Sequence, residues 1–207
     1  MHDARPSGRA RLKQRGETAM RLIVGISGAT GAYMGYRLLQ ALSAHPDVET
    51  YLVVSDAAKR TIECEHAPAL EEFQSLADHV LAYDDLAACI SSGSFKTAGM
   101  IVIPCSMKSL SAIANSYGDN LLTRAADVCL KEGRKVVLVP REMPLSKSHI
   151  RNLYQAADNG CVIIPPMLTF YQDYETTESQ VDHIIGKILS QFDLEYAPFK
   201  PWIGEGE

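Results

Sequence analysis

The segment RLIVGISGATGAYMGYRLL, residues 21–39, runs from an apolar stretch through three glycines into a helical pattern. Residues 20–26 predict a buried strand, and residues 32–44 predict a helix with leucines on one side. Ser27 and Thr30 lie between the glycines and add hydroxyl groups to the turn. A glycine-rich turn between a strand and a helix is typical of loops that bind a phosphate group.

The same alternation of strand and helix continues through the rest of the chain. Apolar runs predict further strands, and helical patterns lie between them: strands at 48–54, 99–104, 135–140 and 161–166, and helices at 106–115, 119–132, 145–157 and 179–192. Short strands that are apolar on both faces favour a parallel sheet covered by helices on both sides. We therefore expect one α/β domain.

Three regions depart from this pattern. Residues 65–98 are less regular, and their segment ISSGSFKT is typical of a loop. The tail contains Pro198 and Pro201 and is expected to pack as an extended arm. Residues 1–19 hold five basic and two acidic side chains, a net charge of +3. They predict a disordered basic extension in preference to a targeting signal, ahead of a functional domain at residues 20–207.

The composition excludes several classes of partner and site. The 207 residues carry a net charge of −5, which gives no indication of nucleic acid as a partner, and no apolar stretch is long enough to cross a membrane. The five cysteines are scattered without a C-x-x-C pair and the six histidines form no cluster, so we expect no disulfide framework and no metal site. A cytoplasmic location fits this cysteine usage.

Polar side chains follow the predicted strands at the points where the strands end. In an open α/β sheet these exits meet at one edge, where ligands bind. The exits supply hydroxyl groups, cations, a tyrosine and one glutamate, in the segments 27–31, 55, PCSMKSLS (104–111), PREMPLS (140–146) and PPMLTFY (165–171). We therefore predict an anion site with one carboxylate, that of Glu142, which can transfer a proton.

The glycine loop alone leaves its ligand open. Its spacing is G-x-x-G-x-x-G, and the dinucleotide fingerprint is G-x-G-x-x-G. The tyrosine and lysine that a short-chain dehydrogenase would also need occur only as Tyr196 and Lys200, which enclose Pro198 and so cannot share a helix. A P-loop is absent, because Lys96 follows Phe95 and not a glycine. Two interpretations remain: the loop binds a monophosphate, or it is a tight turn that binds no ligand.

The residues around the third strand exit also have two interpretations. Residues 106–109 open a helix whose N–H groups favour an anion, or they form a plain helix cap beside a solvated lysine. Cys105 has no histidine at these exits to activate it, so we expect a buried packing residue. Arg124, Asp127 and Lys131 share one helix face, which is either solvated or part of an interface.

From Met20 to Trp202 the chain resembles the UbiX family, the flavin prenyltransferases formerly described as subunits of aromatic-acid decarboxylases. The resemblance is carried, in order, by GISGATGAYMGYRLL, SSGSFKTAGMIVIPCSMKSLSAI, LLTRAADVCLKEGRKVVLVPREMPLS and PPMLTFY. It implies a single-domain, flavodoxin- or Rossmann-like three-layer sandwich with a parallel sheet. It also implies a homo-oligomer, typically a dodecamer, with active sites between subunits.

The resemblance implies a reaction as well. Reduced FMN takes a dimethylallyl group from dimethylallyl phosphate at its central-ring nitrogen, and a fourth ring closes onto the neighbouring benzenoid carbon. The product, prenylated FMN, serves UbiD-type decarboxylases, and a flavin reductase supplies the reduced FMN. No metal is expected, so hydrogen-bond donors and cations of the protein stabilise the departing phosphate.

Residue by residue, the resemblance implies FMN contacts at Gly28, Ala29, Thr30, Ser55, Ser106, Met107, Lys108, Ser109 and Arg141. Many family members have serine at position 30, and Thr30 keeps the hydroxyl but adds a methyl group. The implied dimethylallyl phosphate site consists of Tyr171, Lys187 and Trp202, with Arg124 and Lys131 contributed across a subunit boundary.

Catalytic roles are implied for three residues. Glu142 matches the acid/base that manages protons around the flavin and the departing phosphate, and Glu65 and Ser27 match further active-site positions. Three alternatives are weaker. A flavoprotein that decarboxylates a peptidyl cysteine would require a catalytic histidine at the strand exits. Direct decarboxylation of an aromatic acid would require a clamp for that acid. A non-catalytic FMN-binding subunit or carrier would not require Glu142, Lys187 or Tyr171.

Overall fold

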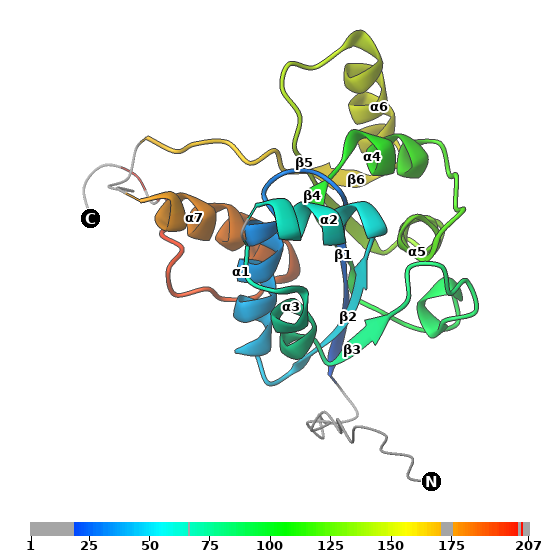
Figure 1. The fold of residues 1–207 in the computed structure, drawn as a ribbon, viewed down its shortest axis with the longest axis horizontal. Coiled ribbons are helices and arrows are strands. Elements are labelled where there is room, and N and C mark those ends of the chain that lie inside the picture. The colour runs from blue at the N-terminus through cyan, green and yellow to red at the C-terminus, as the bar shows by residue number, and fades with distance from the viewer. Residues whose placement is uncertain (1–18, 66, 171–175, 203, 205–207) are drawn as a thin grey trace, which may run out of the picture.

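Strands and helices alternate along the chain in the computed structural model, which describes residues 19–65, 67–170, 176–202 and 204 (Figure 1). The strands are β1 (Met20–Ile26), β2 (Val48–Val54), β3 (His79–Leu81), β4 (Gly99–Cys105), β5 (Lys135–Pro140) and β6 (Cys161–Ile163). The helices are α1 (Ala32–Ser43), α2 (Asp56–Cys64), α3 (Leu70–Leu76), α4 (Met107–Ala114), α5 (Leu121–Lys131), α6 (Lys147–Asp158) and α7 (Thr177–Leu189). Two short 3₁₀ helices are η1 (Cys89–Ser91) and η2 (Ser190–Phe192).

The described strands form one parallel sheet in the order β3-β2-β1-β4-β5-β6. This is the Rossmann-type order, in which the chain moves outward from β1 in one direction and then in the other. The predicted parallel α/β fold is therefore confirmed. The direction reverses between β1 and β4, so the crevice at the carboxyl ends of these two strands is the expected ligand site.

Helices cover both faces of the sheet and give the predicted three layers. Alternate residues of β1 point to opposite faces: Leu22, Val24 and Ile26 join one buried cluster, and Ile23 joins the other. The first cluster is completed by α1, α2, α3 and α7, and the second by α4, α5, α6 and η1. Figure 1 shows α1 and α7 on one side of the sheet and α5 on the other.

The prediction for residues 65–98 missed two elements, α3 and β3. β3 is a three-residue edge strand whose outer two residues are only half-buried, so it lacks the continuous apolar run that marks the other strands. The last strand is shorter than predicted: it ends at Ile163, and Pro165 and Pro166 follow without N–H groups for further pairing.

The tail packs as an extended arm, as predicted. After η2 the chain has no regular structure up to residue 202, and Leu194 and Tyr196 pack against the first core cluster. The predicted basic extension lies outside the described residues, apart from residue 19. No helix in the described part of the chain has both the length and the apolar character that a membrane span requires.

Candidate active site

Ser27 ties the ends of β1 and β4 together at the point where the strand order reverses. Its buried hydroxyl donates to the carbonyl oxygen of Pro104 at 3.0 Å and accepts from the backbone N–H of Ser106 at 2.8 Å. Because the donor and an acceptor site of this hydroxyl are both engaged, Ser27 fixes the spacing of the two strand exits. Its catalytic role stays a prediction.

The glycine loop leads into a helix whose start is capped by a carboxylate. Gly31 caps α1 with a φ of 96°, a left-handed conformation that glycine adopts without strain. Oε1 of Glu65 accepts from the N–H of Gly31 at 2.8 Å, and Oε2 accepts from the N–H of Ala32 at 3.0 Å. Glu65 directly follows α2, so the end of α2 closes the N-terminus of α1. The catalytic role of Glu65 stays a prediction.

Gly28 brings the same loop against α2. A Cβ atom at this position would lie 2.4 Å from the Cβ of Ala57, so only glycine allows the approach. Of the neighbouring residues that the resemblance assigns to FMN, Ala29 is half-buried and Thr30 is exposed. Thr30 therefore offers its hydroxyl to solvent or to a ligand on the outside of the loop.

Neutral hydroxyls cap the next two helix starts along this edge. The Ser55 side chain caps α2 by accepting from the N–H of Ala58 at 3.1 Å. The Ser106 hydroxyl caps α4 by accepting from the N–H of Ser109 at 3.2 Å. The N–H groups of Met107 and Lys108 belong to the first turn of α4, which has no acceptor within its own helix. The dipole of α4 and the exposed Lys108 make this helix start electropositive.

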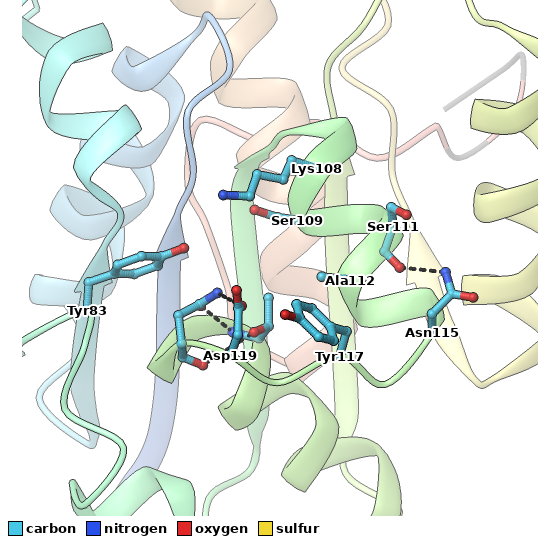
Figure 2. A pocket seen from close by; sticks show the side chains of 10 residues that line it. Tyr83, Lys108, Ser109, Ser111, Ala112, Asn115, Tyr117 and Asp119 are labelled. Carbon is cyan, nitrogen blue, oxygen red and sulfur yellow. Dashed lines mark hydrogen bonds between the residues drawn. The ribbon is translucent and has the colours of Figure 1, made fainter.

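A cavity of about 490 Å³ opens beside the start of α4. Its lining comes from α4, the turn before α5, the first turn of α5 and the segment after β3: Tyr83, Lys108, Ser109, Ser111, Ala112, Asn115, Tyr117, Asp119, Asn120 and Thr123. Figure 2 shows the Lys108 side chain extending from α4 toward Tyr83 across the cavity, with Tyr117 and Asp119 on the side of α5. Two predicted FMN contacts, Lys108 and Ser109, therefore belong to this cavity.

Most of the cavity lining was missed by sequence reasoning. Asn120 is buried, and its Oδ1 caps α5 by accepting from the N–H of Thr123 at 3.0 Å. Its Nδ2 donates to Asp119 at 2.6 Å, which fixes the orientation of the amide. Burial raises the pKa of Tyr83, and the nearby carboxylate of Asp119 adds to this effect. An asparagine before an apolar run was a detectable cap signal, whereas Tyr83 lies in the segment without a clear pattern.

The loop after β5 brings Arg141 and Glu142 to the same edge. The backbone N–H of Arg141 donates to the carbonyl oxygen of Cys105 at 3.1 Å, so this loop begins next to the start of α4. Both side chains are exposed, and Oε1 of Glu142 accepts from the N–H of Met143 at 3.0 Å. The Glu142 carboxylate is therefore held by one backbone donor and is open to solvent.

Cys105 is a packing residue, as predicted. Its side chain is fully buried in the second core cluster, and burial raises the pKa of its thiol well above the ordinary value. The thiol is therefore protonated at neutral pH and is not a nucleophile. All five cysteines are free in the structure.

Arg124 and Lys131 face the loop around η1 and not the cavity. The Nε of Arg124 donates to the carbonyl oxygen of Ser91 at 3.3 Å, and its guanidinium pairs with Asp127 at 3.0 Å. Lys131 lies at the end of α5, about 15 Å along the helix from its start, and pairs with Glu132 at 2.6 Å. Within one chain these two cations are thus separate from the other predicted ligands.

The remaining predicted ligands of the prenyl donor lie in or near the C-terminal part. Tyr171 lies outside the described residues. Lys187 is exposed in the last turn of α7, with its Nζ 5.9 Å from the ring centroid of Phe199. Trp202 is 57% exposed at the end of the arm. The assignment of these residues to the donor stays a prediction.

The residues at this edge fit FMN. Hydroxyl groups, a helix N-terminus and the cations Lys108 and Arg141 suit a phosphate group, because they supply donors and positive charge together. The cavity has the size of a small-molecule site, and Tyr83, Tyr117 and Ala112 give it walls against which a flat ring system can pack. Among the described residues, no group of three or more His, Cys, Asp or Glu side chains is placed to hold a metal ion.

Comparison with known proteins shows the family to which the chain belongs. Residues 11–192 match the family model described as "Flavoprotein". A probable UbiX-like flavin prenyltransferase from Sedimentibacter hydroxybenzoicus is 61% identical over 185 residues, which cover 89% of this chain and 98% of the relative. The flavin prenyltransferase UbiX of Thauera aromatica is 49% identical over 188 residues, which cover 91% of this chain and 96% of the relative.

Comparison with solved structures indicates the same family. A dodecameric FMN-dependent UbiX-like decarboxylase from Escherichia coli O157:H7 superposes with a TM-score of 0.87 at 53% identity, covering 89% of this chain and all of the other. AnUbiX (PadA1) in complex with FMN and dimethylallyl pyrophosphate superposes with a TM-score of 0.88 at 44% identity, covering 91% of this chain and 100% of that one. On this evidence the chain belongs to the flavoprotein family and, within it, to the UbiX-like flavin prenyltransferases.

Proposed function

We propose that this chain transfers a dimethylallyl group from dimethylallyl phosphate to reduced FMN and so makes prenylated FMN. The observation that carries the proposal is the arrangement at the β1/β4 crevice. There, the hydroxyl-capped start of α4 and the cation Lys108 lie next to the loop that bears Arg141 and Glu142. A cavity of about 490 Å³ opens along α4 and includes Lys108 in its lining. The relatives that share most of the chain are flavin prenyltransferases, and one solved neighbour holds FMN together with a prenyl diphosphate.

The chain's own residues have distinct tasks in this proposal. Ser106, Lys108 and Arg141 bind the FMN phosphate, and the cavity orients the ring system. When bound, reduced FMN supplies the nucleophilic nitrogen and the neighbouring carbon that accept the prenyl group. Glu142 transfers protons between the flavin and the departing phosphate. Its carboxylate can do so because it is exposed on the loop that also bears Arg141.

The departing phosphate requires cations, which a homo-oligomer would bring together. Tyr171, Lys187 and Trp202 come from one part of the chain, and Arg124 and Lys131 lie on α5, away from the cavity of their own subunit. We propose that a neighbouring subunit contributes them, in a dodecamer like that of the E. coli relative. Exposed apolar side chains around α6 and after β6 support association: Met143, Leu145, Ile150, Tyr154, Met167, Leu168 and Phe170.

The reaction connects to two further classes of protein. A flavin reductase would supply the flavin, because the transfer requires FMN in its reduced form. A UbiD-type decarboxylase would take up the prenylated FMN. We place these steps in the cytoplasm, where free thiols such as those of Cys64 and Cys89 stay reduced.

The test is an anaerobic incubation of the full chain with chemically reduced FMN and dimethylallyl phosphate, followed by mass spectrometry of the flavin. We expect a flavin heavier by one five-carbon unit, absent without the protein. The diphosphate is the second donor to be tried, because the solved neighbour contains it. Unchanged FMN with both donors, with FMN shown to be bound, would overturn the proposal.

The variant Glu142→Gln separates an enzyme from a non-catalytic FMN carrier. The amide keeps the size of the side chain and removes the proton transfer, so we expect the rate of prenyl transfer to fall by about 100-fold or more. FMN affinity should change little, since Glu142 is not a phosphate donor. A rate unchanged by Glu142→Gln would contradict the assigned role.

A further inference from the structure

The C-terminal arm is attached to α7 at two points that lie one helical turn apart. The hydroxyl of Tyr196 donates to Oδ1 of Asp182 at 2.8 Å, and the Phe199 side chain packs over Gly186. Asp182 and Gly186 are four residues apart and so share one face of the helix. The two contacts therefore fix the arm on this face of α7.

The first attachment is a three-residue polar cluster. Asp182 also pairs with the guanidinium of Arg37 on α1, at 2.5 Å, so the tyrosine, the aspartate and the arginine connect the arm to both helices. Burial is the main cause that raises the pKa of Tyr196 to about 12, and the hydrogen bond to Asp182 adds to it. The phenol is thus protonated at neutral pH and serves as the donor.

The second attachment depends on the missing side chain of Gly186. A Cβ atom at this position would lie 2.2 Å from Cγ, 2.3 Å from Cβ and 2.4 Å from Cδ2 of Phe199. These atoms are close to the Phe199 backbone, so the ring cannot escape by a small rotation of its far end. A glycine inside a helix costs about 0.5–1 kcal/mol relative to alanine, and here the structure uses it to seat Phe199.

Phe199 also contacts the residue to which the prenyl phosphate is assigned. Its ring centroid lies 5.9 Å from Nζ of Lys187 and 5.3 Å from the ring of His183. A cation near an aromatic ring is held by the ring's electrostatic field. Trp202 follows Phe199 by three residues, so the same attachment also sets the position of Trp202.

We infer that Gly186, Tyr196 and Phe199 are positioning residues, which fix the arm on α7 and thereby hold Lys187 and Trp202 in place for the prenyl phosphate. This inference rests on the proposed function for the roles of Lys187 and Trp202. The attachment itself does not depend on that function, because the contacts are made within the chain. Neither Gly186, Tyr196 nor Phe199 was singled out for such a role by the sequence.

The experiment uses the full chain with bound FMN and the variants Gly186→Ala, Tyr196→Phe and Phe199→Ala. Because Trp202 is the only tryptophan, its fluorescence anisotropy reports the arm directly. We expect the anisotropy to fall and the KM for dimethylallyl phosphate to rise about tenfold in Gly186→Ala, with a smaller change in kcat and an unchanged Kd for FMN. Glu195→Ala, an exposed position on the same arm, is the matched control and should leave all values unchanged.

A double variant tests the packing between the two residues. In the Phe199→Ala background, Gly186→Ala should have no additional effect, because the ring with which it clashes is gone. Independent effects of the two changes would overturn the inference, as would unchanged anisotropy or an unchanged KM in Gly186→Ala. Failure of the unmodified chain to make prenylated FMN would overturn the proposed function instead.

Discussion

Helices α1 and α4 both begin at the carboxyl edge of the sheet, next to the β1/β4 crevice, but they are capped in opposite ways. The start of α1 is closed by both carboxylate oxygens of Glu65, at 2.8 and 3.0 Å. The start of α4 is closed by one neutral hydroxyl, that of Ser106, and carries the exposed Lys108. The start of α1 thus binds a carboxylate of the protein itself, whereas the start of α4 remains electropositive.

This contrast shows that a glycine-rich loop does not by itself locate a phosphate. The N–H groups of Gly31 and Ala32 would be the first candidates in the loop, and Glu65 already occupies them. The segment at the start of α4, residues 104–111, contains no glycine. This helix start nevertheless remains electropositive and borders the cavity. Four changes test this difference, and they follow in order of decreasing expected effect.

Lys108→Ala tests the positive helix start. Loss of a charged donor to a phosphate should raise the Kd for FMN by about 10- to 100-fold, measured by quenching of flavin fluorescence. Lys59→Ala is the control, because Lys59 is a partly exposed lysine on α2 that pairs with Asp56. Equal effects of the two changes would show that general charge, and not the start of α4, attracts the flavin.

Glu65→Ala tests the occupied helix start. Two N–H groups of α1 lose their acceptor, so the free energy of unfolding should fall by about 2 kcal/mol in chemical denaturation. Glu65→Gln keeps an acceptor oxygen and should lose less. The neighbouring Glu63→Ala, at an exposed position on α2, should have no effect. Tighter FMN binding in Glu65→Ala would break the comparison, because it would reveal a phosphate site under the carboxylate.

Ser27→Ala removes the connection between the two exits. The carbonyl of Pro104 and the N–H of Ser106 each lose a buried partner, so the free energy of unfolding should fall by about 1–2 kcal/mol. Ser75→Ala, an exposed serine on α3, should change stability by less than about 0.5 kcal/mol. If the Ser27 variant keeps full stability but loses prenyl transfer, its role is catalytic and not structural.

Thr30→Ser should have the smallest effect. The position is exposed and the hydroxyl is retained, so the Kd for FMN and the rate of prenyl transfer should change by less than about threefold. Thr30→Val is the matched comparison, because it keeps the shape and removes the hydroxyl. A tenfold change in Thr30→Ser would show that the extra methyl group touches a ligand.

Sequence reasoning predicted β1, β2, β4 and β5 because these strands are buried on both faces and are therefore largely apolar. It also predicted β6 from its apolar run, but made it too long. It missed β3, which has three residues at the sheet edge, and α3, which buries one phenylalanine fully and so shows no extended periodicity. A local sequence pattern reflects which side chains are buried, and these two elements bury too few side chains to give a clear pattern.

The residues of the candidate site were likewise predictable only in part. The polar residues at strand exits were predictable because a parallel sheet brings its carboxyl ends to one edge. The contacts of Glu65 with α1 and of Tyr83 with the cavity were not, because they depend on how a helix or a loop returns to an edge that lies far away in sequence. Contacts between segments so far apart are determined by tertiary packing, which cannot be inferred from a short stretch of sequence.

The reversal of strand order between β1 and β4 also governs the order in which a newly made chain can fold. β1 pairs with β2 soon after both leave the ribosome, but its other edge waits for β4, in the register Leu22 to Gly99. The bond from Ser106 to Ser27 spans 79 residues. A nascent chain that stops before β4 thus exposes an open edge of its central strand, where pairing with a second chain competes with folding. The β1/β4 crevice, where we propose that the flavin binds, therefore cannot form until the chain has been made as far as Ser106.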